Sequence, residues 1–241
     1  MFKKISILFL FFSGLVLGDG WTKKAGSGYY AIDMRLLNAS KYHNSSGDNI
    51  DINSVMDLAF NLYSEYGLTD ELTLKLNFPF YKILDYDMPE NGQVNNLDLD
   101  NSGIGDLDLG MRYKVAKFGN TVLAVGLTFG IPISTDDVYG AENKFALSDG
   151  EFNQIIGLEA GHSLYPFPGY VSGSIKYNNR NEGYSDQFYA GVETGYNVKK
   201  NLLLNLRFNY LKSLKNGSKE VIENVIPIQA NNQEYLALKF G

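Results

Sequence analysis

The chain has 241 residues, a net charge of −6, 14% aromatic residues, 25 glycines and no cysteine. This length allows one barrel domain or one to two soluble domains, and the absence of cysteine excludes a disulfide framework. The acidic balance and the lack of any basic stripe argue against a nucleic-acid partner. No apolar run after the N-terminus is long enough for a membrane helix, but barrel strands alternate and would escape that test.

The N-terminus has the features of a secretory signal peptide. Residues 1–18 place Lys3 and Lys4 before an apolar stretch that ends in small residues, an order typical of a segment removed on export. The apolar stretch is too short to anchor the chain as a helix. The sequence therefore predicts a signal peptide at 1–18, a periplasmic N-terminal segment at 19–28 and one domain at 29–241.

The clearest pattern in the exported chain is a strict alternation of residue types between positions 107 and 131. In its first half, Leu109 and Met111 alternate with Asp108 and Arg112. Successive side chains of a strand point to opposite faces of the sheet. The pattern therefore predicts an antiparallel hairpin with one apolar face and one face of charged and small residues.

Similar alternation predicts about ten strands. In chain order they span 29–37, 54–66, 71–83, 107–115, 123–131, 151–163, 170–178, 187–198, 202–210 and 235–241. An extra strand segment at 221–228 would raise the count, and twelve strands is the alternative. The long polar connections are predicted at 38–51, 84–102, 133–149 and 213–232.

Full charges in mid-strand indicate where the sheet resides. An ordinary protein core would not tolerate them without partners, whereas a closed barrel in a bilayer turns its apolar face to lipid and its polar face inward. Aromatic residues of the apolar face gather at strand ends, as in interfacial girdles: Tyr30, Tyr66, Tyr113, Tyr177, Tyr196, Phe208 and Tyr210. The sequence thus predicts an all-β fold, an antiparallel up-and-down transmembrane β-barrel with short periplasmic turns and long extracellular loops. The competing interpretation is a secreted soluble β-sandwich or lipocalin-like barrel with its apolar residues inside.

The face opposite the apolar one would line the barrel lumen. The predicted lumen-lining residues are Asp33, Arg35, Asp57, Asn61, Lys75, Asp106, Asp108, Arg112, Lys176, Glu193 and Arg207. Glu65, Glu71, Lys114, Glu159 and Lys239 share this face. The two signs of charge nearly balance. Two interpretations stay open: a plug of ion pairs that stiffens a narrow barrel, or a polar path for a small solute.

Catalytic and metal sites find little support. His162 and Ser163 are neighbours on one strand and point to opposite faces, so they cannot form a nucleophile–base pair there. Asp106 and Asp108 share a face, but no histidine accompanies this carboxylate pair. The stretch from Asp98 begins like a calcium loop, yet its twelfth position holds leucine instead of glutamate. The sequence predicts no enzyme, no metal site and no cofactor.

Several stretches resemble an outer-membrane barrel family named for the meta-pathway of phenol degradation. They read GIGDLDLGMRYKV followed by LAVGLTFGIP, and, earlier in the chain, EYGLTDELTLKLNFPF. The resemblance covers most of the exported chain through short motifs. It implies a porin-like transporter of small, apolar or aromatic compounds in the outer membrane of a Gram-negative envelope.

Two functions from different classes follow as expectations. The first is a passive channel for a small solute, and the alternative is a closed structural barrel whose loops bind lipopolysaccharide or a partner. Expected partners are outer-membrane lipid and lipopolysaccharide. The last strand, from Tyr235 to Phe240, resembles the C-terminal signal that the barrel-assembly machinery recognises, with Gly241 added after the aromatic residue.

Overall fold

The computed structural model describes residues 20–43, 49–87, 100–134, 147–148, 150–199, 202–218 and 233–240. Predicted features at 1–18 and 221–228 lie outside the described residues. The described part of the chain contains eleven strands. They are β1 (Gly28–His43), β2 (Asn49–Gly67), β3 (Leu72–Asp87), β4 (Asn101–Gly103), β5 (Leu107–Phe118), β6 (Thr121–Ile131), β7 (Asn153–Ser163), β8 (Gly169–Arg180), β9 (Gln187–Lys199), β10 (Leu202–Ser213) and β11 (Glu234–Phe240). Among the described residues, no helix is long and apolar enough to cross a membrane.

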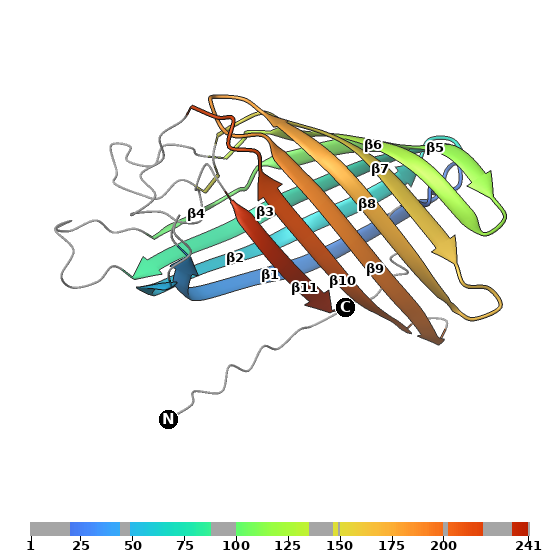
Figure 1. Ribbon diagram of the computed structural model, residues 1–241, viewed down its shortest axis with the longest axis horizontal. Helices are drawn as coiled ribbons and strands as arrows, with labels where there is room; N and C mark the ends of the chain where they lie inside the picture. Colours follow the sequence, from blue (N-terminus) through green and yellow to red (C-terminus); the bar gives the residue numbers. More distant parts are fainter. Residues whose placement is uncertain are drawn as a thin grey trace.

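The strands form one antiparallel, up-and-down sheet that curls around an interior (Figure 1). Ten strands follow one another in the order β1-β2-β3-β5-β6-β7-β8-β9-β10-β11, and β4 pairs with β3 beside that path. This strand order confirms an antiparallel outer-membrane barrel fold of about ten strands. The described residues form no ladder between β1 and β11.

Most strands begin and end within a few residues of their predicted limits, but the first three reach further. Positions 38–43, 49–51 and 84–87, predicted as loop, belong to β1, β2 and β3. The many Asn, Ser and Gly residues around them favoured a loop, although residues 49–53 and 84–87 do alternate and the backbone ladders reach these positions. A membrane strand needs about 9–11 residues, so β2, with 19 residues, is longer than the bilayer requires. The three-residue β4, inside the predicted loop 84–102, was missed because it is too short to show a period.

The two faces of the sheet differ in chemistry as predicted. On β7, the outward Ile156 and Leu158 are exposed by more than half. Glu159, which follows Leu158 and points to the opposite face, is 2% exposed. The inside-out arrangement suits a wall surrounded by lipid, and it contradicts a soluble barrel with an apolar interior. Six of the seven predicted girdle aromatics are exposed outward: Tyr30, Tyr66, Tyr113, Tyr177, Tyr196 and Phe208.

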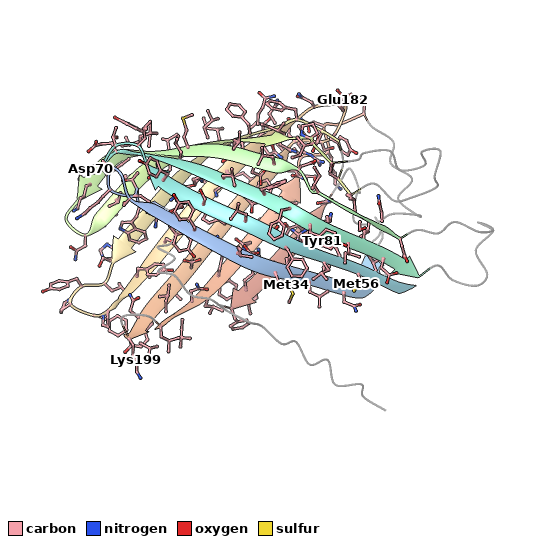
Figure 2. All side chains as sticks on the ribbon, turned by 180° about the vertical axis from the view of Figure 1, so that it is seen from behind. Met34, Met56, Asp70, Tyr81, Glu182 and Lys199 are labelled. Carbon is pink, nitrogen blue, oxygen red and sulfur yellow. The ribbon has the colours of Figure 1, made fainter. Side chains whose placement is uncertain are left out.

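Short turns gather at one end of the barrel. Asp70, between β2 and β3, and Lys199, at the end of β9, lie at this end, while Glu182, between β8 and β9, lies at the other (Figure 2). We call these the short-turn end and the long-loop end. The two-residue connection from β5 to β6 lies at the short-turn end, and its Gly119 has a φ of 57°, a conformation that glycine adopts without steric cost.

Candidate functional site

Arg112 of β5 is the centre of a buried charge cluster inside the barrel. Its side chain is 3% exposed. The guanidinium donates from Nη1 to Glu65 Oε1 on β2 at 3.0 Å, and from Nε to Glu159 Oε2 on β7. One arginine therefore bridges two strands on either side of its own, which is a use of the planar, forked donor that lysine could not reproduce.

Three lysines surround the same two carboxylates. Lys23 Nζ lies 3.2 Å from Glu65 Oε2. Lys75 Nζ and Lys176 Nζ lie 3.7 and 3.5 Å from Glu159 Oε1. The charge layer, as we name it, consists of Lys23, Glu65, Lys75, Arg112, Glu159 and Lys176. It holds four cations and two carboxylates.

The stretch Gly20–Ser27, which we call the N-terminal segment, lies inside the short-turn end. The Trp21 ring packs against Gly161 of β7, where a β-carbon would come within 2.5 Å of the indole. It also meets the ring of Tyr170 edge-on at 5.5 Å between centroids. Arg112 Nη1 donates to the carbonyl oxygen of Trp21 at 3.1 Å, so the segment joins the charge layer.

Hydrogen bonds to the β2–β3 turn and to the start of β3 hold the N-terminal segment in place. The Lys23 amide donates to Thr73 Oγ1 at 2.7 Å, and the Ala25 amide donates to Asp70 Oδ1 at 2.9 Å. A β-carbon at Gly67 would lie 2.1 Å from the carbonyl oxygen of Lys24. The wall is therefore shaped to receive this segment, which sequence analysis assigned to the periplasm without a structural role.

A second polar group continues around the wall beside the charge layer. Glu193 of β9 accepts from Tyr170 Oη at 2.5 Å and from Arg207 Nε at 2.6 Å. The Tyr170 ring covers Gly195, whose β-carbon would come within 2.2 Å of it. Glycines thus provide the space for the Trp21 and Tyr170 rings.

A different set of charges occupies the lumen toward the long-loop end. Asp57, 8% exposed, lies 3.4 Å from Arg35 Nη2 and 3.5 Å from Lys82 Nζ. Lys82 Nζ also donates to the carbonyl oxygen of Leu147 at 2.7 Å. Leu147, 3% exposed, packs against Gly103 of β4. A buried leucine of the β6–β7 connection therefore lies beside this charged group.

The remaining predicted lumen residues make local polar contacts. Asn61 donates to Asp33 at 2.7 Å, and Asn77 donates to Asp108 at 3.1 Å. Asp106 lies just before β5 and accepts from the amide and hydroxyl of Ser134. Asp106 and Asp108 therefore serve separate partners and do not form a carboxylate pair.

Hydrogen bonds at the long-loop end hold the β8–β9 connection against residues 214–218. We call this group, formed by Tyr177, Arg180, Asp186 and Asn216, the polar lock. Asp186 accepts from Tyr177 Oη at 2.6 Å, the Arg180 amide at 3.0 Å and Asn216 Nδ2 at 2.7 Å. Burial raises the pKa of the Asp186 carboxyl, but these hydrogen bonds and the Arg180 charge outweigh burial and lower the pKa below its ordinary value.

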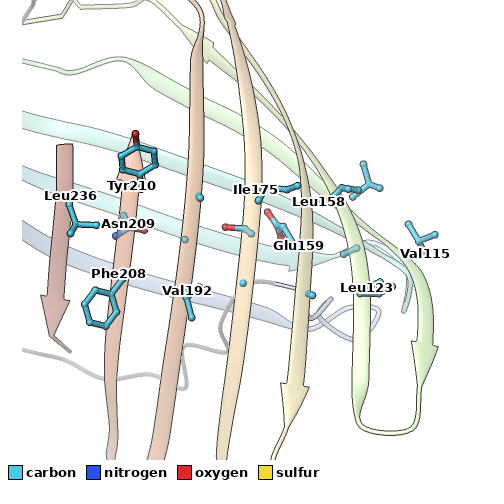
Figure 3. A pocket seen from close by; sticks show the side chains of 17 residues that line it. Val115, Leu123, Leu158, Glu159, Ile175, Val192, Phe208, Asn209, Tyr210 and Leu236 are labelled. Atoms are coloured by element: carbon cyan, nitrogen blue, oxygen red, sulfur yellow. The ribbon is translucent and has the colours of Figure 1, made fainter. Parts of the chain in front are cut away.

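One hollow lies on the outer wall and not in the lumen. It measures about 640 Å³ and is lined mainly by apolar atoms of outward residues on β5 to β11, among them Leu158, Ile175 and Val192 (Figure 3). Its surroundings are those of lipid chains. The polar lumen, with its converging charges, is therefore the better candidate for a functional site.

Histidine and metal chemistry find no support among the described residues. His162 faces outward, and its Nδ1 lies 2.8 Å from Thr121 Oγ1. No group of three or more potential metal ligands occurs in the part of the chain that the structure describes.

Comparison with known proteins supports the fold alone. No family model matches the chain, and no curated protein matches it. A crystal structure of an outer membrane channel from Pseudomonas putida F1 matches with a TM-score of 0.60 and 17% identity, covering 83% of this chain and 77% of that channel. The chain thus has the fold of an outer-membrane β-barrel, and the resemblance to the phenol meta-pathway family stays a prediction.

Proposed function

We propose that the protein is an outer-membrane channel for a small solute. The observation that carries this proposal is the polar lumen, in which Glu65, Arg112 and Glu159 are buried behind a wall whose outer face is apolar. Polar and charged groups that line a narrow passage are the means by which channels select solutes. The contacts of the N-terminal segment with Arg112, and of Leu147 with Lys82 and Gly103, favour a narrow passage in this proposal.

The alternative is a structural barrel that stays closed. The ion pairs of the charge layer favour it, since such pairs also stiffen a wall without passing anything. Under this alternative the long loops would provide the function by binding lipopolysaccharide or a protein. For the channel, we propose a small solute that is apolar or aromatic. We further propose that residues 1–18 direct export and that the assembly machinery recognises residues 235–240.

Conductance of the refolded protein separates the two functions. The exported chain, from about Asp19, would be compared in a planar bilayer with a variant that starts at Gly28 and lacks the N-terminal segment. A channel predicts rare or small openings for the first and larger, discrete openings for the second. A truncated barrel that folds and inserts but conducts nothing would instead support the structural alternative.

A further inference from the structure

We infer that the charge layer is an anion-binding site, and that its ligand is the carboxylate of a small solute. The inference rests on the proposed function and names the class of solute. Nothing in the comparisons assigns it.

The first argument is the local excess of positive charge. The lumen as a whole is nearly balanced, but the ion pairs described for the charge layer join four cations to two carboxylates. Glu159 is shared by Lys75, Arg112 and Lys176, so one negative charge faces three positive ones. The neighbouring pair of Glu193 and Arg207 is neutral as a unit and leaves this excess unchanged.

The second argument is burial. The four cationic side chains are between 3% and 29% exposed. Low-dielectric walls strengthen the field of a charged cleft and concentrate ions of opposite sign in it. Rings of arginine and lysine select anions in pores for this reason. The acidic Asp108 contributes an opposing field at Lys75, so the attraction is centred toward Arg112 and Lys176.

The third argument is an acceptor position that is already in use. Arg112 Nη1 donates to the backbone carbonyl of Trp21 at 3.1 Å, which is a neutral acceptor. A carboxylate in the same place would add the attraction between opposite charges to the hydrogen bond, and this attraction is strong where water is largely excluded. A solute carboxylate would therefore compete with Trp21 for Arg112, and binding would loosen the N-terminal segment.

Trp21 reports on this site directly because it is the only tryptophan of the chain. The experiment measures quenching of its fluorescence in the refolded exported chain by iodide and by caesium at equal ionic strength. Acrylamide, which is neutral, measures general access to the ring. The proposal expects the ratio of the iodide to the caesium quenching constant to exceed the ratio for free tryptophan amide by about tenfold, the low end of the enrichment in a cleft of one charge sign.

Charge variants locate the effect. Lys176→Gln should lower iodide quenching several-fold with acrylamide quenching unchanged, and Lys75→Gln serves if that variant does not refold. Lys199→Gln is the matched control, because Lys199 is exposed at the end of β9, outside the charge layer. Equal quenching by the two ions, or iodide quenching that is unchanged in folded Lys176→Gln, would overturn the proposal.

Competition tests the carboxylate itself. Acetate should protect Trp21 from iodide, and acetamide, of the same shape but neutral, should not. Equal protection by both would refute a carboxylate site. A barrel that conducts nothing but is quenched preferentially by iodide would support the anion site and contradict the channel. A barrel that conducts but shows no preference for iodide would support the channel and contradict the anion site.

Discussion

The ring of Trp21 occupies the space that a side chain at position 161 would need. A β-carbon on Gly161 would lie 2.5 Å from the indole, which is closer than non-bonded carbon atoms approach. The glycine in the wall and the aromatic residue in the N-terminal segment therefore depend on each other.

Gly161→Val should displace the N-terminal segment while the strand itself persists. Overpacking of this kind costs about 1–3 kcal/mol, and valine suits a strand. We expect red-shifted Trp21 emission, stronger acrylamide quenching and larger conductance. Gly173→Val is the control, because its β-carbon would meet only Gly191 oxygen, at 3.5 Å. Unchanged emission in folded Gly161→Val would contradict the packing described.

Removal of the Arg112 charge should destabilise the barrel strongly. Arg112→Met leaves Glu65 and Glu159 buried without their shared cation, and breaking a buried ion pair costs about 3–5 kcal/mol. The free energy of unfolding in urea, followed by circular dichroism, measures the loss. Arg35→Met is the control. The Arg35 side chain is 58% exposed beside Asp57, and such pairs contribute about 1 kcal/mol or less. Similar losses in the two variants would argue against a special role for Arg112.

Tyr170→Phe should weaken the polar group around Glu193 without disturbing the ring packing on Gly195. A hydrogen bond to a charged group contributes about 1.5–3 kcal/mol, and Arg207 remains as a partner of the carboxylate. We expect a loss of stability within or below this range, measured by the same unfolding experiment. Tyr165→Phe, on an exposed turn residue, should change nothing, and an equal loss there would show that the effect is not specific.

The polar lock at the long-loop end should open only in acid. Because the folded pKa of Asp186 is lowered from its ordinary 3.8, the stability from this carboxylate is present above about pH 3.8 and is lost as the pH falls through the folded pKa. Hydrogen exchange of the Leu214 amide, which donates to the Asp186 carbonyl, should keep its protection down to about pH 4 and lose it below. In the Asp186→Asn variant the Leu214 amide should exchange faster at neutral pH. In Glu182→Gln, a variant of an exposed neighbour, its exchange should be unchanged. Protection lost near pH 6 would contradict this assignment.

Alternation alone carried most of the fold. Ile156, Leu158 and Glu159 each took the face that their parity predicts, because a period of two leaves no freedom once a register is set. The same rule placed Arg112 and Lys176 on the inner face. It could not reveal that Arg112 reaches both Glu65 and Glu159, since pairing across several strands depends on barrel curvature.

Residues outside the strands could not be placed by this reasoning. Trp21 and Lys23 precede β1, and Leu147 lies in a long connection, so no period applies to them. The signals that were present are indirect. A lone tryptophan just after the predicted signal peptide and inward glycines at 161 and 195 indicate, in retrospect, that aromatic rings lie against the wall.

The position of the N-terminal segment has a consequence for the order of assembly. Its contacts come from Thr73 on β3, Arg112 on β5, Gly161 on β7 and Tyr170 on β8, so its binding place exists only after these strands have joined. Residues 20–27, which are synthesised before the strands, can thus take their position only after strands as far along the chain as β8 have joined the sheet. Trp21 emission would follow this step separately from the growth of the sheet.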